Sequence, residues 1–183
     1  MSIESMVLNI QSEIGNIPKA LIRKEIFRAA RYFCSQTAVV KESVSVTAPA
    51  GSDLVSIPNP SDQLMALSIQ VIEELNSNQY SQPEYGQLAI NAAPSIDLDL
   101  TITVSCRPSP SATTLPDILN YWDQALEAGA LYELYKKPKK EWTDLNMAAV
   151  KKAELDSYVH DAKQQSAQGA QAGSRRQKLR NFT

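Results

Sequence analysis

Apolar residues recur at helical spacing in four parts of the chain. The first of these parts carries them at i, i+3, i+4, i+7 and i+11, namely at Ile3, Met6, Val7, Ile10 and Ile14. Similar spacing predicts four helices, over residues 3–14, 18–38, 116–137 and 144–165. Gly15 stands where a helix C-cap favours glycine, and Pro18 and Pro116 suit the first turns of the second and third helices.

Between residues 41 and 107 the period changes from 3.6 to 2. The clearest case runs from Ile96 to Cys106, where apolar residues alternate with polar ones without interruption. Such alternation predicts a strand with one buried and one solvent-facing side. The fold class we expect is therefore α+β: a bundle of two N-terminal and two C-terminal helices with an inserted, small, mostly antiparallel sheet of four to six strands.

Residues 1–165 fit a single domain of this kind. The segment that follows, SAQGAQAGS, has too little apolar content to join a core. Residues 166–183 are therefore expected to form a flexible basic C-terminal tail.

Gly129 is unusual because an interior glycine costs a helix roughly 1 kcal/mol relative to alanine. It continues an apolar stripe that includes Ile118, Trp122 and Ala125, and it is flanked by alanines. We therefore expect it to mark the close approach of another backbone. Ala148 belongs to the thin stripe of the last helix, where alanine favours tight packing.

The net charge of −2 conceals an asymmetry. Residues 1–161 carry 13 basic and 20 acidic residues, whereas residues 162–183 carry five basic residues and no acid. An acidic body disfavours a general nucleic-acid binder. No apolar run approaches the roughly 18 residues of a membrane span, no signal-peptide pattern opens the chain, and two cysteines without a CxxC motif favour a reduced, intracellular origin.

Candidate chemical sites are few. His160 is the only histidine, so one chain cannot assemble a histidine metal cluster or a Ser–His relay. Asp97 and Asp99 fit a hard cation, but outward positions of an alternating strand would look the same. Cys34 is interpreted as a small core residue. We expect no catalytic, cofactor-binding or metal-binding residue and no enzymatic activity.

Two surface features remain open to interpretation. The basic side of the second helix, with Arg23, Lys24, Arg28 and Arg31, is either a surface that faces another subunit or a portal, or a solvated face. Trp122 and Trp142 either border a binding groove or act as large core anchors at a helix junction, which the pattern favours.

Three segments follow patterns that occur together in one family of proteins. The family's C-terminal pattern of a small-residue helix followed by P-x-x-x-W-x-D is matched by Ala125, Gly129, Ala130, Leu134, Pro138, Trp142 and Asp144. Its second-helix pattern is matched by Ala29, Ala30, Phe33, Cys34 and Thr37. Its strand pattern is followed approximately by Pro94, Asp97, Leu100, Ile102, Val104 and Pro108.

Through these segments the chain resembles the head-to-tail connector (neck adaptor) proteins of tailed bacteriophages. The resemblance runs from about Pro18 to Phe182 and implies a structural virion protein with no cofactor. Such an adaptor is made in the host cytoplasm and lies in the virion neck, as a ring that matches the twelvefold portal. It extends the DNA channel through which the genome is ejected and gives the tail a platform. The implied partners are further copies of the chain in a dodecamer, the portal protein, and a tail tube, nozzle or next neck protein. Double-stranded DNA would pass without sequence-specific contact, and no membrane is involved.

The tail carries the most specific implication. By the resemblance it docks on the portal through Arg175, Arg176, Lys178, Leu179, Arg180 and Phe182. The residues expected to pack the ring and the subunit core are Trp122, Ala125, Gly129, Trp142 and Ala148. Composition alone leaves a docking peptide, a solvated tail and a nonspecific DNA contact equally open. The alternatives for the whole chain are a head- or tail-completion protein of the neck or, in a different class, a DNA-binding or regulatory module that uses the basic helix and tail.

Overall fold

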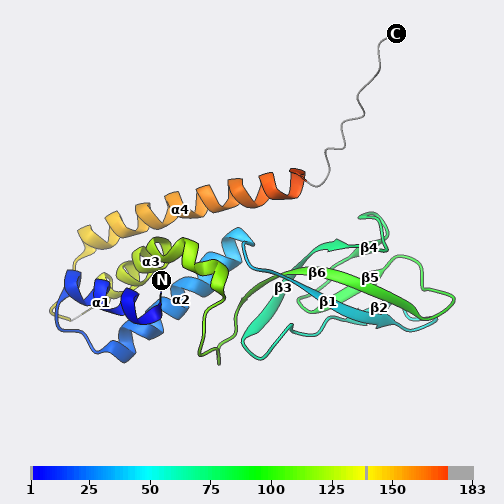
Figure 1. Cartoon of the computed structure of the whole chain (residues 1–183), viewed down its shortest axis with the longest axis horizontal. Coiled ribbons are helices and arrows are strands. Elements are labelled where there is room, and N and C mark those ends of the chain that lie inside the picture. Colours follow the sequence, from blue (N-terminus) through cyan, green and yellow to red (C-terminus); the bar gives the residue numbers. More distant parts are fainter. Residues whose placement is uncertain (1, 139, 173–183) are drawn as a thin grey trace, which may run out of the picture.

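The computed structural model describes residues 2–138 and 140–172, and it divides them into two regions that lie side by side (Figure 1). The first is a helical body, formed by the described residues of the stretches 2–38 and 117–172. The second is a β-lobe, formed by residues 39–116, which is inserted between α2 and η1. The α+β class predicted from the sequence is confirmed.

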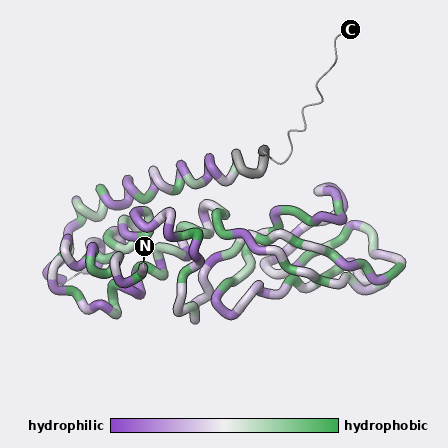
Figure 2. The backbone as a smooth tube through the Cα atoms, viewed as in Figure 1, coloured by the Kyte–Doolittle hydropathy of each residue, from purple (hydrophilic) through white to green (hydrophobic). Residues whose placement is uncertain are grey.

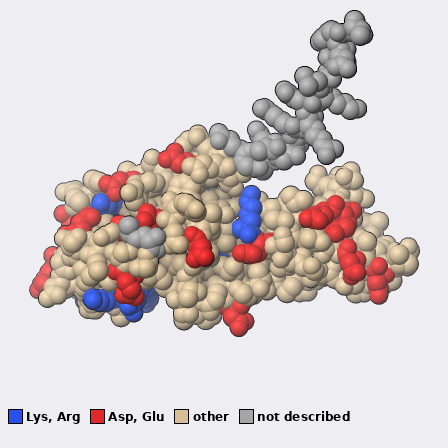
Figure 3. Space-filling model, viewed as in Figure 1, with Lys and Arg blue, Asp and Glu red and all other residues tan. Residues whose placement is uncertain are grey.

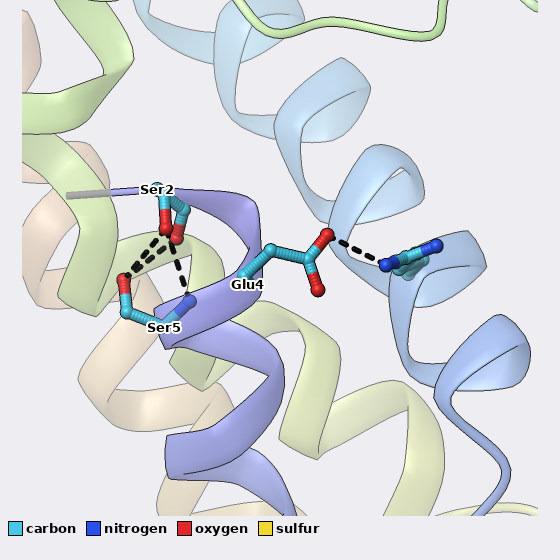
Figure 4. A network of polar contacts seen from close by, with 4 residues as sticks. Ser2, Glu4 and Ser5 are labelled. Carbon is cyan, nitrogen blue, oxygen red and sulfur yellow. Dashed lines mark hydrogen bonds and ion pairs between the residues drawn. The ribbon is translucent and has the colours of Figure 1, made fainter.

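The helical body contains α1 (Ile3–Ile14), α2 (Lys19–Thr37), the 3-10 helix η1 (Asp117–Trp122), α3 (Asp123–Tyr135) and α4 (Leu145–Ala172). The hydroxyl of Ser2 accepts a hydrogen bond from the N–H of Ser5 and so caps α1. Glu4 in the first turn pairs with Arg23 of α2 at 2.6 Å (Figure 4). Gly15 has a positive φ of 89° and ends α1, as its position predicted.

The β-lobe holds two sheets rather than the single sheet that the sequence suggested. β1 (Lys41–Ala48), β6 (Leu98–Pro108) and β3 (Leu64–Ile72) form one antiparallel sheet in the order β1-β6-β3. β2 (Leu54–Ser56), β5 (Gln87–Ile90) and β4 (Tyr80–Ser81) form the other, in the order β2-β5-β4. Alternation predicts individual strands but not the sheet to which each belongs, because pairing is decided by contacts far apart in sequence.

The structure corrects three predicted boundaries. The helix predicted over residues 116–137 begins as a 3-10 turn, and Ile118 on its expected inner face is 41% exposed. The last helix extends to Ala172, so residues 166–172 are helical where a flexible segment was expected. Ile96, taken as the first inward residue of a strand, lies before β6 and is 73% exposed.

One apolar cluster runs through both regions. Hydrophobic stretches of the backbone occur in both of them (Figure 2). It combines Ile26 and Phe33 of α2 with Leu126 of α3 and with Leu100 and Ile102 of β6. Since the two regions share a core, the lobe is held against the helices by burial of apolar surface as well as by the chain itself.

The two ends of the lobe meet at its junction with the helices. Ala38 caps α2 in the left-handed conformation, with φ 52°. Two residues later the carbonyl of Val40 accepts the N–H of Cys106 at 2.9 Å. The chain therefore enters and leaves the β1–β6 pair through neighbouring backbone segments.

Candidate functional site

The centre of the helical body is a contact in which α2, α3 and α4 meet at small residues. A Cβ placed on Gly129 would lie 2.8 Å from the Cβ of Ala29 and 3.5 Å from a methyl of Leu155. Gly129 therefore marks the close approach that its unusual position predicted. Alanine at position 129 would gain helix propensity but would require α2 and α3 to move apart.

Beside this contact lies a cleft of about 260 Å³ between the three helices. Its floor is formed by Ala29, Gly129 and Leu155, and its walls include Tyr32 and Tyr132. Charged side chains stand at its edge, and they are Arg28, Glu133 and Lys152. The cleft is large enough for one side chain of another protein, with an apolar floor and a charged rim.

A buried group of charges stabilises the same junction. Glu25 of α2 is 1% exposed, and its carboxylate pairs with the ammonium of Lys137 at 2.9 Å. Glu133 of α3 pairs with Lys136 at 2.8 Å, and Arg28 lies 3.1 Å from its second oxygen without forming a hydrogen bond. The hydrogen bond to Glu133 raises the pKa of Lys136. The two carboxylates thus connect α2, α3 and the turn after α3 through three cations.

The sequence did not reveal the buried role of Glu25. The spacing alone places Glu25 on the inner face of α2, because it follows Ile22 by three residues and precedes Ala29 by four. A carboxylate among apolar positions is the signal of a buried ion pair. Its partner, Lys137, lies in the basic break before Pro138, where nothing in the local pattern indicates it.

The structure places the predicted packing residues within the chain's own fold. Ala125 is fully buried, Gly129 is buried, and Ala148 is 5% exposed. Trp122 is half-buried and packs on Phe33 with ring centroids 5.4 Å apart. These residues build the subunit core, and a role in packing between subunits stays a prediction.

Trp142 lies in the turn between α3 and α4. It is half-buried, and Lys140 stands 5.9 Å from the centroid of its ring. Its indole N–H is buried and has no hydrogen-bond acceptor within the part of the chain that the structure describes. Together with Trp122, it is an anchor at a helix junction, which the sequence pattern favoured over a groove.

Both cysteines are buried at the boundary between the two regions. Burial raises the pKa of Cys34 to about 12 and the pKa of Cys106 to about 11. A thiol with such a pKa is neutral at physiological pH and is a poor nucleophile. Cys34 is a core residue, as the sequence suggested. His160 is exposed, and its ring contacts the side-chain amide of Gln164 at 2.9 Å.

The acidic pair of the lobe binds its own turn. Asp97 accepts the N–H of Ala50 at 2.8 Å, and Asp99 accepts the hydroxyl of Thr47 at 2.7 Å. Over residues 2–138 and 140–172, no group of three or more His, Cys, Asp or Glu is arranged to hold a metal ion. The two carboxylates therefore hold the end of β1 and the turn after it against the start of β6.

Some predicted features lie beyond what the structure describes. Arg175, Arg176, Lys178, Leu179, Arg180 and Phe182 fall outside the described residues, so the tail hypothesis has no structural counterpart here. Among the described residues, no helix combines the length and the hydropathy that a membrane span requires.

No family model matches the chain, and no curated protein resembles it closely enough to be matched.

Proposed function

We propose that this protein is a head-to-tail adaptor of a tailed bacteriophage virion. In this proposal it forms a ring below the portal, extends the DNA channel and provides the platform on which the tail assembles. Its place would be the virion neck, between the portal and a tail tube, nozzle or further neck protein.

The supporting observation is the order of elements. The resemblance implies two helices, a β insertion and two further helices that lead to a basic terminal segment. In the structure, α2 leads into the β-lobe, the chain returns through η1 to α3, and α4 extends to Ala172, directly before the basic residues. The three resembling segments fall on α2, on β6 and on α3 with the following turn.

The ring would be assembled head to tail, so each subunit must offer two different surfaces. The exposed side of α2 carries Lys19, Arg23 and Lys24, whereas the β-lobe carries eight acidic and two basic residues. Opposite charges on separate regions favour a heterologous contact in which the body of one copy meets the lobe of the next.

The portal contact is assigned to the C-terminal residues 174–183. Four basic side chains would pair with acidic groups of the portal, and Phe182 would enter a pocket. This assignment rests on the resemblance and on the composition of the segment.

The test is co-sedimentation of the purified chain with the portal encoded in the same genome, at moderate salt. We expect a large complex with about equal numbers of the two subunits. Removal of residues 174–183 should abolish the complex, and a variant with the same segment in scrambled order serves as its control. If the shortened chain still binds the portal in full, the docking role of the segment is wrong.

The same experiment separates the alternative of a DNA-binding module. Such a module would ignore the portal and would bind duplex DNA with an affinity that falls steeply with salt. The net charge of −6 on the β-lobe disfavours it, because the phosphate backbone is repelled by an acidic surface.

The acidic side of the β1–β6 pair suggests a further property of the channel. If Asp97 and Asp99 face the passing genome, they would repel it and keep the channel from gripping DNA. Virions with Asp97→Lys and Asp99→Lys should then eject their genome more slowly, and an unchanged rate of ejection would remove this role.

A further inference from the structure

β1 is an edge strand whose free side can be identified from its register. Lys41 lies opposite Ser105, and the N–H of Cys106 donates to the carbonyl of Val40. In an antiparallel pair, residues that exchange hydrogen bonds alternate with residues that do not. The even-numbered residues of β1 therefore bond to β6. The backbone groups of Ser43, Ser45 and Thr47 point away from it.

Thr101, which lies opposite Ser45 on β6, provides an independent check. Its carbonyl accepts the N–H of Glu73 at 3.1 Å, and its N–H donates to the carboxylate of Glu74 at 2.8 Å. Both partners follow β3 in the chain, so the backbone of Thr101 points away from β1. This is the direction that the alternation requires.

The free side of β1 is open. Apart from the β1–β6 ladder, no hydrogen bond to the backbone of Ser43, Ser45 or Thr47 occurs among residues 2–138 and 140–172. All three residues are exposed. The strand is eight residues long, pairs with β6 without a bulge and contains no proline. An edge of this kind is a template for another strand.

β3, on the opposite side of the same sheet, is protected. Its pairing with β6 is interrupted by two register shifts. The side chain of Gln82 accepts the N–H of Ile69 and donates to the carbonyl of Leu67, both at 2.9 Å, as a neighbouring strand would. Asn59 accepts the N–H of Ala66 at 3.0 Å. Of the two edges, only β1 lacks such protection.

We propose that β1 pairs antiparallel with β1 of a second copy of this chain, centred on Ser45. In this register Ser45 faces Ser45, Ser43 faces Thr47, and Val44 faces Val46. Polar residues then oppose polar residues on the exposed face, and valines oppose valines on the inner face. The two three-stranded sheets become one sheet of six strands across a two-fold axis.

The charges around β1 agree with a second copy as the occupant. No charged residue lies between Ser43 and Ala48, so the paired segments oppose no like charges. Asp97 and Asp99 contact the end of β1 at Thr47 and Ala50. Antiparallel pairing places these acidic ends at opposite ends of the joint sheet. Residual repulsion between the two acidic lobes predicts that salt strengthens the association.

A cysteine at the centre of the register tests the proposal directly. Facing residues of a hydrogen-bonded antiparallel pair have Cα atoms about 5.5 Å apart, a separation that a disulfide accepts. Under mild oxidation, Ser45→Cys should form a disulfide dimer much faster than Ser77→Cys, which exposes a thiol in a turn outside the edge. Cys34 and Cys106 stay out of the reaction because they are buried.

The register itself is tested by mixing. Ser43→Cys and Thr47→Cys should each form few disulfides alone and should form a mixed dimer when combined. Equal rates for Ser45→Cys and Ser77→Cys, or equal rates for the mixture and its components, would overturn the pairing.

A proline variant tests the same edge without chemistry. The N–H of Ser45 bonds nothing among the described residues, so Ser45→Pro removes only the donor needed by a second copy. Wild type should sediment as a monomer–dimer mixture that shifts towards dimer with concentration and with salt. Ser45→Pro should remain monomeric with an unchanged circular dichroism spectrum. A wild type that stays monomeric throughout overturns the proposal, whether or not the proline variant folds.

This inference is independent of the adaptor function. A ring contact is head to tail and yields oligomers larger than two, whereas β1 pairing is two-fold and stops at two. Loss of portal binding with intact Ser45 cross-linking would refute the function alone. The reverse result would refute the pairing alone.

Discussion

The two regions of this molecule use charge in opposite ways. The stretches 2–38 and 117–172 of the helical body have 12 acidic and 12 basic residues, and all eight ion pairs found among the described residues lie within the body. The β-lobe has eight acidic and two basic residues, and the described structure contains no ion pair in it. On the face drawn in Figure 3 the lobe accordingly shows several red patches and little blue.

The difference shows what holds each region together. In the body, the carboxylate of Glu25 is buried and needs the cation of Lys137. In the lobe, carboxylates stay in solvent and accept hydrogen bonds at turns and strand ends, as Asp97 and Glu74 do. The hydrogen bond from the N–H of Thr101 lowers the pKa of Glu74. Charge is part of the interior of the body, and in the lobe it belongs to the surface.

The largest expected effect comes from breaking the buried pair of the body. Lys137→Met leaves the carboxylate of Glu25 buried with only Arg28 nearby, at 3.8 Å. Loss of one partner of a buried pair costs about 3–5 kcal/mol. We expect the free energy of unfolding in urea to fall by that order.

The matched control is the double variant Glu25→Leu with Lys137→Met. It replaces both charges by apolar groups and should recover most of the loss, because no buried charge is left unpaired. A single variant as stable as wild type would show that Glu25 is solvated in practice, and the contrast between the two regions would disappear.

High pH should weaken the boundary between the regions. The folded pKa values of Cys34 and Cys106 are raised to about 12 and about 11, against 9.0 for a free thiol. The stability that comes from keeping these thiols neutral is complete below pH 9.0 and is lost as the pH rises towards the folded values. Each thiol costs about 1.4 kcal/mol per pH unit in that range. Thermal unfolding of wild type and of Cys34→Ala, compared between pH 8 and 10.5, measures it.

In the alanine variant the slope of stability against pH should be about half that of wild type. An identical slope in the two proteins would mean that other groups, and not the thiols, determine the alkaline loss.

Gly129→Ala tests the close helix packing at the centre of the body. Alanine gains roughly 1 kcal/mol of helix propensity, yet its Cβ would meet the Cβ of Ala29 at 2.8 Å. Overpacking costs about 1–3 kcal/mol, so we expect a net loss of about 1 kcal/mol in chemical denaturation.

The double variant Ala29→Gly with Gly129→Ala moves the methyl group from one helix to the other. It should be more stable than the sum of the two single changes, since each alone either crowds or empties the same contact. If the effects of the two changes on stability simply add, the loss caused by Gly129→Ala does not come from its contact with residue 29.

The smallest effects belong to the acidic residues of the lobe. Glu73→Gln and Glu84→Gln remove exposed charges and should change stability by less than about 0.5 kcal/mol. Glu74→Gln keeps an acceptor for Thr101 but should remove the part of stability that is present above the usual pKa of 4.5 and lost as the pH falls below it. Thermal unfolding followed from neutral to acidic pH distinguishes Glu74 from the other two residues.

The sequence predicted the elements of the body better than the pairing of the lobe. The helical stripe from Ile3 to Ile14 matches α1, and the period-2 pattern located β6 to within two residues at each end. Periodicity is a property of each segment alone, so it predicts a helix or a strand without any knowledge of the rest of the fold. Gly129 was identified because a glycine within a helix is costly and therefore needs a reason.

The remaining features depend on contacts that no local pattern contains. The partition into two sheets, the ion pair of Glu25 with Lys137 and the helical continuation to Ala172 all fall in this class. Gln82 is a further example, since only the fold shows that its amide replaces a strand beside β3. Each is a choice between partners distant in sequence, where propensity is a weak guide.

The neighbouring ends of the β-lobe have a consequence for how this chain can change. Because Val40 and Cys106 are hydrogen-bonded, everything from β1 to β6 departs from and returns to one place on the helical body. Insertions succeed where the ends of the inserted segment lie close together. Loops of the lobe can therefore be lengthened or shortened while the helices keep their arrangement, as long as the core that β6 shares with α2 is retained. Such a chain could keep one set of neighbours through its helices and acquire new ones through the lobe.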